Sequence, residues 1–313
     1  MNDRPTLQEL VEVQRRFGLQ TQALVEKDWF VARALAAIAA SDKGPFQLVF
    51  QGGTALSRAH RLIERMSEDI DLKIVSAEKQ PRAAYRRLRE SVTKALLDAG
   101  FTFDPANEAQ RLSMYESTYT LFRLPYGALA GSDAVLRPEI QIEISAWPMR
   151  RPSVDRAVTS FVAEAFGRPA EVAAIACADL AENAAEKFVA LTRRAGAELA
   201  GLREKRDPTL VRHIYDLHML EAHVDPAGVA ALAGEIMLDD AAARGGKFPA
   251  YRDDPLRETL KAVEGIAADP KFAEEYAVFM RRMVYGRTPE FAAALPTLET
   301  LARELEKTRT RKV

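Results

Sequence analysis

The sequence is poor in cysteine, since Cys177 is the only one among 313 residues. A single cysteine cannot form an intramolecular disulfide, so the composition favours a reducing compartment, and we expect a cytoplasmic protein. Cys177 lies in the apolar stretch AAIACADLA, which predicts a small buried side chain rather than a nucleophile. The N-terminal segment lacks the apolar core of a signal peptide.

The sequence also lacks long hydrophobic runs and an excess of charge. No run of about 18 apolar residues occurs, so we expect no membrane-spanning helix. The 44 Lys and Arg residues nearly balance the 45 Asp and Glu residues, giving a formal net charge of −1. Any contact with a nucleic acid must therefore come from a local basic cluster. The candidate clusters are 82–89 (Arg82, Arg86, Arg87 and Arg89), Arg150–Arg151 and Arg193–Arg194.

What the sequence contains is a change of pattern along its length. Runs rich in β-formers or alternating at period two predict strands at 46–50, 69–75, 113–126 and 136–147. Apolar residues at helical spacing predict helices over 21–40 and 81–100, and helical spacing dominates from about residue 177. We therefore predict an α+β fold with two domains, a mixed β-sheet with flanking helices over 1–165 and a helical domain over 166–313.

The stretch QGGTALSRAHRLIERMSEDIDLKI, residues 51–74, joins a glycine pair to two like charges. Gly52–Gly53 follows a predicted strand, and Thr54 is expected to cap a helix over ALSRAHRLIER. Such a turn can present backbone N–H groups to a phosphate. Asp69 and Asp71 fall on the same face of the next strand, where a hard cation such as Mg²⁺ would offset their repulsion and also bind substrate phosphates. The stretch predicts one metal and phosphate site.

These segments resemble a known family, the AbiEii/AbiGii nucleotidyltransferase toxins of the polymerase-β-like nucleotidyltransferase superfamily. The matching segments are VEKDWFVARAL (25–35), GGTALSRAH (52–60), RMSEDIDL (65–72), AEKFVALTRR (185–194), VRHIYDLHML (211–220) and, more loosely, FMRRMVYGRTPEFAAAL (279–295). The resemblance implies a polymerase-β-like core followed by a helical domain that completes the active site.

The resemblance also implies roles for individual residues. The residues that would hold the nucleotide's phosphates are Gly52, Gly53 and Thr54, with Arg58 and Arg65 as further basic candidates. Asp69 and Asp71 would ligate divalent metal, with a third carboxylate from Glu143 or, in competition with it, Glu139. Lys187 would contact the triphosphate, and Asp216 would be an acidic residue of the active site.

Several of these residues also have a purely structural interpretation. Lys187 follows a pattern typical of an exposed helix face, and Arg212 and Asp216 have the i,i+4 spacing of a helix-stabilising pair. His213 stands where the family segment has an aspartate, and a surface or packing role is its alternative. Four aromatic residues are expected in the core rather than as base-stacking platforms: Trp29, Phe30, Tyr115 and Tyr119.

The resemblance predicts a Mg²⁺-dependent nucleotidyltransferase that acts as the toxin of a bacterial toxin–antitoxin or phage-defence system. It would transfer a nucleotide from an NTP to an acceptor, with tRNA favoured and a protein as the alternative acceptor, and its partner would be an antitoxin encoded alongside. Two other functions stay open at this point. One is a catalytically weak protein-binding module of the same fold, and the other is a metal-dependent phosphohydrolase that uses Asp69 and Asp71.

Overall fold

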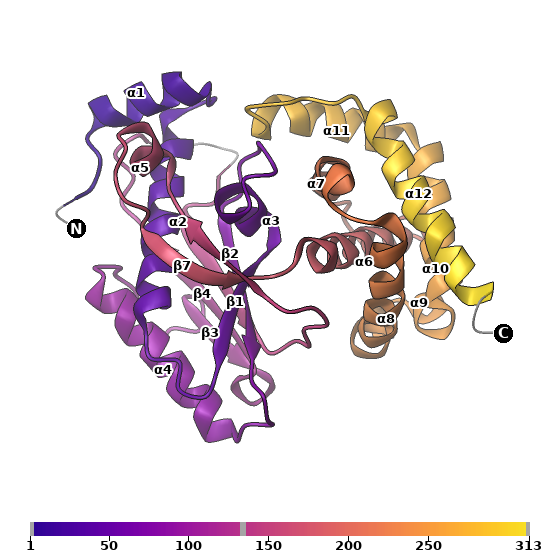
Figure 1. Cartoon of the computed structure of the whole chain (residues 1–313), viewed down its shortest axis with the longest axis horizontal. Coiled ribbons are helices and arrows are strands. Elements are labelled where there is room, and N and C mark those ends of the chain that lie inside the picture. Colours follow the sequence, from indigo (N-terminus) through magenta and orange to yellow (C-terminus); the bar gives the residue numbers. More distant parts are fainter. Residues whose placement is uncertain (1–2, 132–135, 311–313) are drawn as a thin grey trace. The chain divides into compact units, whose positions relative to one another are not determined.

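The computed structural model describes residues 3–131 and 136–310, shown in Figure 1. The chain forms two compact units, Met1–Ala178 and Asp179–Val313. The first unit carries a β-sheet, and the second is built mainly of helices. The sequence pattern had suggested a division at residue 165, whereas the last strand of the sheet ends at Cys177.

The first unit is organised around a mixed seven-stranded sheet with the strand order β3-β4-β5-β2-β1-β7-β6. The strands are β1 (Gln47–Gln51), β2 (Asp69–Val75), β3 (Arg111–Met114), β4 (Tyr119–Pro125), β5 (Glu139–Ser145), β6 (Val154–Val158) and β7 (Val172–Cys177). The pairs β2–β5 and β1–β7 are parallel, and the other neighbouring pairs are antiparallel. The predicted strands are confirmed, with 113–126 resolved into β3 and β4.

The helical segments of the first unit are α1 (Leu7–Phe17), α2 (Gln22–Ala40), α3 (Gly52–Thr54), the π-helical turn η1 (Ala55–Ala59), α4 (Arg82–Asp98), η2 (Tyr115–Ser117) and α5 (Phe161–Ala165). Helix α2 packs against β2, β5 and β7, with α4 beside it. The apolar side of the sheet is completed by alternate residues of the two central strands, all buried: Ile70, Leu72, Ile74, Ile140, Ile142 and Ile144. Each such side chain contributes about 2 kcal/mol of hydrophobic stabilisation.

The second unit begins with a long helix and continues as a helical assembly. Its elements are α6 (Leu180–Leu199), α7 (Arg212–Leu220), η3 (Glu221–His223), α8 (Pro226–Arg244), η4 (Gly245–Lys247), α9 (Pro249–Asp253), α10 (Pro255–Ala268), α11 (Pro270–Met283) and α12 (Phe291–Thr310). Helices α8, α10 and α11 share one start signal, an Asp N-cap followed directly by Pro. Aspartate caps a free N–H group and proline needs none at the first helical position.

Some predictions about local structure are wrong. Strands β6 and β7 were not predicted, because β6 is largely exposed and β7 is rich in alanine, so neither shows the alternation of a strand. The predicted helix after Thr54 ends at Ala59, and Thr54, which directly precedes this turn, makes no side-chain capping hydrogen bond. None of the helices in the described ranges is long and apolar enough to cross a bilayer.

The aromatic and cysteine predictions have mixed outcomes. Trp29 and Phe30 are buried, and so is Cys177, whose thiol pKa is raised to about 12 by burial. Tyr115 is 75% exposed, because it sits in the turn between β3 and β4 with a positive φ. Tyr119 is half-buried on the polar face of the sheet.

Candidate active site

The glycine turn after β1 lies directly against the carboxylate of Asp71. Gly52 has a φ of +79°, and a Cβ added there would stand 2.3 Å from Oδ2 of Asp71 and 3.2 Å from its Cγ. A residue with a side chain would be strained in this conformation and would displace the carboxylate. The sheet register explains the contact, because Gln51 is paired with Asp71 across the antiparallel strands. The structure therefore brings together two of the predicted site residues.

Gly53 also has no room for a side chain, because Arg65 lies against it. A Cβ at Gly53 would stand 2.4 Å from Nη2 of Arg65 and 2.7 Å from Oγ of Ser67. Arg65 is 4% exposed, and its Nη1 donates to the carbonyl of Met66 at 2.9 Å. The guanidinium thus supports the glycine turn from the interior of the unit.

Thr54 connects the turn to the start of β2. Its hydroxyl donates to the carbonyl of Asp69 at 2.5 Å and shares a hydrogen bond of 3.0 Å with the hydroxyl of Ser67. The residue is 1% exposed. Because its hydroxyl is used inside the unit, Thr54 fixes the distance between the glycine turn and Asp69.

The polar face of the sheet gathers three carboxylates. Asp71 and Glu143 are register partners on the parallel strands β2 and β5, and Asp69 is paired with Gln141. Glu139 is the first residue of β5, and its register partner is Pro125 of β4. Of the two candidates for the third carboxylate, the register sets Glu143 beside Asp71.

Tyr119 of β4 completes this face. Its hydroxyl donates to Oε2 of Glu143 at 3.3 Å. Burial, followed by the charges of Glu143 and Asp71, raises the pKa of Tyr119 to about 12. The phenol therefore stays protonated near neutral pH and acts as a hydrogen-bond donor that orients Glu143.

Asp69 forms an ion pair with Arg137, whose Nη1 also donates to the side chain of Gln141. The backbone of Arg137 is held on both sides: its N–H donates to Glu68 at 3.1 Å and its carbonyl accepts from Lys27 at 2.7 Å. The paired side chains of Arg137 and Asp69 are 45% and 35% exposed. Only the outer part of the arginine is therefore free to move.

The carboxylates fit a hard cation in their chemistry, although they do not form a finished metal site. Within residues 3–131 and 136–310, no three carboxylate, imidazole or thiolate groups already stand at metal-binding separation. The available donors are all oxygen atoms, which Mg²⁺ prefers, and the absent side chain of Gly52 leaves the backbone close to Asp71. A cation that binds Oδ1 of Asp69 would have to replace the guanidinium of Arg137.

Helix α2 places three consecutive charged residues in the interior, the Glu26-Lys27-Asp28 segment. Glu26 accepts from the N–H groups of Leu129 and Ala130 at 3.0 Å. Lys27 donates to the carbonyls of Arg137 and Glu139 at 2.7 and 2.6 Å and pairs with Glu68 at 3.1 Å. Successive helix residues point about 100° apart, so a helix can bury all three only if it is enclosed on most sides. Lys27 thereby fixes the segment that presents Arg137.

Asp28 organises the other side of the same helix. It accepts from Nε of Arg58 at 2.8 Å and from the N–H of Phe161 at 2.7 Å. The guanidinium of Arg58 also stacks 3.3 Å from the ring centroid of Phe161. Burial raises the pKa of Asp28 to about 6 against the opposing effect of Arg58. The structure thus places Arg58, a predicted phosphate contact, in a buried cluster that joins α2 to α5.

In the second unit, Lys187 of α6 and Asp216 of α7 form a buried ion pair, with Nζ and Oδ2 2.6 Å apart. The side chains are 8% and 0% exposed, so Lys187 does not lie on an open helix face. His213 is also buried, and its two ring nitrogens have no hydrogen-bond partner among the described residues. Burial, then the charges of Arg212 and Lys187, holds the pKa of His213 well below 6.5. The imidazole is therefore neutral.

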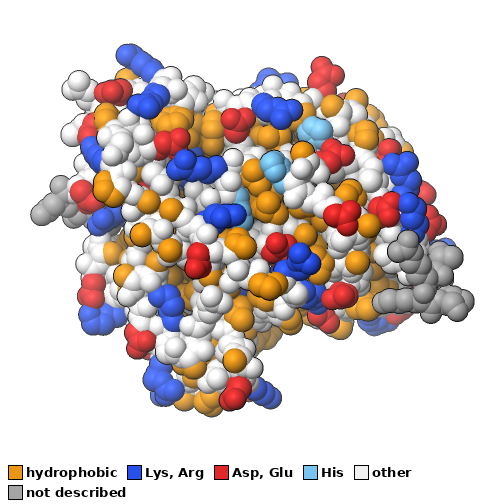
Figure 2. Space-filling view, viewed as in Figure 1, with side chains coloured by type: hydrophobic (Ala, Val, Ile, Leu, Met, Phe, Trp, Pro, Cys, Tyr) orange, Lys and Arg blue, Asp and Glu red, His pale blue; other side chains and the backbone are white. Residues whose placement is uncertain are grey.

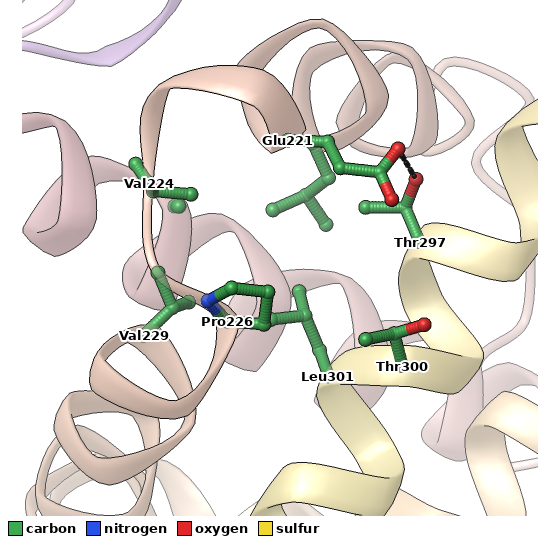
Figure 3. A pocket seen from close by; sticks show the side chains of 9 residues that line it. Glu221, Val224, Pro226, Val229, Thr297, Thr300 and Leu301 are labelled. Carbon is green, nitrogen blue, oxygen red and sulfur yellow. Dashed lines mark hydrogen bonds between the residues drawn. The ribbon is translucent and has the colours of Figure 1, made fainter.

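The hollow drawn in Figure 3 lies elsewhere in the second unit. Thr297 donates to Glu221 at 2.9 Å at its rim, and Val224, Val229 and Leu301 make the lining mostly apolar. Its volume is about 10 Å³, which is room for about one water molecule. This hollow is too small for a nucleotide.

Sequence reasoning missed Arg137 and Gln141 and placed Tyr119 in the core. Arg137 is separated from Gln141 and Glu143 by even numbers of residues. In extended backbone such residues point to the same face, so the sequence could have predicted that the three share one. The parallel pairing of β2 with β5 brings that face to Asp69. The sequence of neither strand indicates which strand it pairs with.

Comparison with known proteins identifies the family of the chain. A family model described as nucleotidyl transferase AbiEii toxin, type IV toxin–antitoxin system, matches residues 33–303. The chain belongs to the AbiEii family. This AbiEii protein is therefore a nucleotidyltransferase toxin, and membership implies an NTP substrate, a divalent metal and an antitoxin partner.

The fold has a counterpart among solved structures. MenT4, a nucleotidyltransferase toxin from Mycobacterium tuberculosis H37Rv, is similar with a TM-score of 0.52 and 17% sequence identity. The similarity covers 95% of this AbiEii chain and 89% of MenT4, and it supports the α+β fold. A comparison with curated protein sequences finds no significant match.

Proposed function

We propose that this toxin transfers a nucleotide from an NTP to an RNA acceptor, with tRNA as the favoured acceptor and Mg²⁺ as the metal. The observation that carries the proposal is the contact between the Gly52 backbone and the Asp71 carboxylate. It sets a phosphate-binding type of turn beside a metal-binding type of residue, as transfer of a charged phosphoryl group requires.

The metal would be held by Asp69, Asp71 and Glu143. When bound, it would offset the charge of the triphosphate and lower the pKa of the acceptor hydroxyl. Tyr119 keeps Glu143 oriented through its hydroxyl, and Lys27 holds the backbone beside Asp69. The positions of the ligands are therefore fixed by contacts that do not themselves involve substrate.

The reaction balances as a simple displacement. The acceptor hydroxyl loses its proton to solvent and its oxygen attacks the α-phosphorus of the NTP. The bond from that phosphorus to the bridging oxygen of the β-phosphate breaks, and pyrophosphate leaves. We assign Lys187 to neutralising triphosphate charge, with Asp216 holding its ammonium group 2.6 Å away. The glycine turn would donate backbone N–H groups to phosphate oxygens, so positioning and electrostatics supply most of the rate enhancement.

The single cysteine supports a reducing compartment, and we place the protein in the cytoplasm. The antitoxin would then meet the toxin in the same compartment.

The test is an assay with each of the four NTPs labelled at the α-phosphate, incubated with purified total tRNA or with cell protein. Label on tRNA that depends on Mg²⁺ and is lost in Asp71→Asn supports the proposal. Free labelled nucleoside monophosphate or diphosphate without labelled acceptor would indicate hydrolysis instead. Label on protein alone would exclude the RNA acceptor. Induction in cells should arrest growth with the wild type and not with Asp71→Asn.

A further inference from the structure

The helical unit contains a basic hollow of about 430 Å³. Its polar lining comes from α6, from the loop after α6 and from the end of α8 with η4, and consists of Arg193, Arg194, Arg203, Glu204, Lys205, Arg244 and Lys247. On the face drawn in Figure 2, Lys and Arg side chains are interspersed with Asp and Glu and form no single field. A local cluster such as this hollow is therefore what a polyanion would require.

The hollow keeps an excess of positive charge after its ion pairs are counted. Asp240 serves two arginines, Arg193 at 2.7 Å and Arg244 at 2.9 Å. Asp207 pairs with Arg194, and Glu198 pairs with Arg203 at 3.7 Å. With Glu204 included, six basic groups face four acidic groups, which leaves two positive charges in a chain whose net charge is −1.

The ion pairs hold the arginines in place without using up their donors. Asp240 is 3% exposed, so Arg193 and Arg244 are anchored from beneath. A guanidinium has five N–H donors and a carboxylate takes two of them at most, so each anchored arginine retains donors for a phosphate. Burial, and then the charges of Arg212, Arg203 and Arg193, lower the pKa of Arg194, whereas the charge of Asp207 raises it.

Two lysines at the hollow have no partner of their own. Lys205 and Lys247 are both exposed, and neither has an ion pair or a side-chain hydrogen bond within the described part of the chain. Holding two unpaired ammonium groups near four arginines costs electrostatic energy in the free protein. An anionic ligand would relieve that repulsion.

We propose that this hollow binds the sugar–phosphate backbone of the acceptor RNA, an inference that rests on the proposed function. A polynucleotide offers many phosphates at regular spacing, which matches basic groups spread over three segments of the chain. A protein partner would need an apolar centre made of several large side chains. In this lining Leu202 is 50% exposed, but Phe248, the other large apolar residue, is only 3% exposed.

The hollow belongs to the same neighbourhood of the helical unit as the Lys187–Asp216 pair. Arg193 and Arg194 of the hollow lie on the same helix, α6, as Lys187. RNA held in the hollow would thus lie near the helices that carry the proposed triphosphate lysine.

The test measures binding of fluorescein-labelled bulk tRNA by anisotropy as a function of salt concentration. The double variant Lys205→Gln/Lys247→Gln removes two exposed charges without touching the ion pairs, so it should fold normally. We expect about tenfold weaker binding and a plot of log K against log salt that is shallower by about 1.4 to 1.8. The matched control is Lys79→Gln/Lys271→Gln, which removes two exposed lysines outside the hollow and should bind tRNA like the wild type.

Equal binding of tRNA by the two double variants would overturn the inference. So would displacement of tRNA by free ATP, because the hollow would then be a nucleotide site. Binding of poly-glutamate as tight as that of tRNA would also overturn it, because any polyanion would then fit. The proposed function is judged separately, by transfer of label from the NTP. If the wild type transfers label but Lys205→Gln/Lys247→Gln binds tRNA as tightly as the wild type, only the RNA-binding role of the hollow is rejected. If the variant binds tRNA more weakly but the wild type transfers no label, only the proposed reaction is rejected.

Discussion

The backbone of Gly52 occupies the space beside the Asp71 carboxylate that a side chain would fill, since an added Cβ would stand 2.3 Å from Oδ2. The glycine therefore has two functions at once. It permits a φ of +79°, and it lets a backbone N–H turn approach a carboxylate. The turn and the carboxylate, which we propose as the phosphate loop and a metal ligand, therefore cannot be altered independently of each other.

Replacing Gly52 with alanine should abolish nucleotide transfer. The positive φ costs about 1 to 2 kcal/mol in a residue with a side chain, and the new methyl group would also push Asp71 out of position. We expect at least a hundredfold loss of transfer rate and a lower urea midpoint. Gly44→Ala is the matched control, because Gly44 has a φ of +55° and nothing within 4 Å of its Cβ position. It should lose similar backbone stability and keep its activity, and a similar loss of activity would contradict the proposed site.

Breaking the Lys187–Asp216 pair should separate stability from catalysis. Lys187→Met leaves a buried carboxylate without its cation, which costs about 3 to 5 kcal/mol. The double variant Lys187→Met/Asp216→Leu removes both charges and should recover most of that stability, as measured by urea unfolding. It should remain inactive in the labelled-NTP assay, because the cation assigned to the triphosphate is gone. An active double variant would assign the pair to folding alone.

The sequence predicted the central strands well because each buries one face. The alternation at 69–75 and 136–147 matches β2 and β5 within a few residues, and it correctly put Asp69, Asp71 and Glu143 on polar faces. It could not say that β2 and β5 are parallel neighbours, because strand pairing depends on contacts between distant segments. Choosing Glu143 over Glu139 required that register.

The buried charges were the least predictable part. Lys187 follows a pattern of an exposed helix, and Arg58 looks like an available cation, yet each is buried against an aspartate. Sequence periodicity treats every charged residue as a surface residue, whereas a paired charge can lie inside. The family resemblance pointed to Glu26-Lys27-Asp28, but only the structure assigns each of the three charges its partner.

Asp28 should make stability depend on pH. Its pKa is about 6 in the folded chain against 3.8 as the ordinary value, with burial as the main cause. Because the folded state binds the proton more tightly, this contribution is present below about pH 4 and is lost as the pH rises through 6. The free energy of unfolding of the wild type, relative to Asp28→Asn, should fall by about 3 kcal/mol at most between pH 4 and 7. A difference that is constant over this range would contradict the raised pKa.

Removing Arg137 should strengthen metal binding. Its guanidinium competes with a cation for Asp69, and an ion pair this exposed contributes about 0.5 to 1 kcal/mol. Arg137→Gln should therefore bind Mn²⁺ about two- to fivefold more tightly in calorimetry without nucleotide. Arg87→Gln removes an exposed arginine of the same unit and should not change the affinity. Unchanged Mn²⁺ affinity in Arg137→Gln would show that the guanidinium does not compete with the metal for Asp69.

The two glutamates of β5 provide the sharpest comparison of all. Glu143 is the register partner of Asp71 and accepts from Tyr119 at 3.3 Å, whereas Glu139 lies four residues away, and its recorded partner is on β4. Both substitutions to glutamine keep the size and polarity of the side chain, so folding should survive in each. If Glu143 is the third metal ligand, Glu143→Gln should weaken Mn²⁺ binding and lower the transfer rate about a hundredfold, and Glu139→Gln should do neither. Tyr119→Phe should show a smaller loss, about tenfold, because the tyrosine orients the carboxylate without binding the metal. The reverse ranking of the two glutamates would move the third ligand to the other end of the strand and would separate it from the Gly52–Asp71 contact.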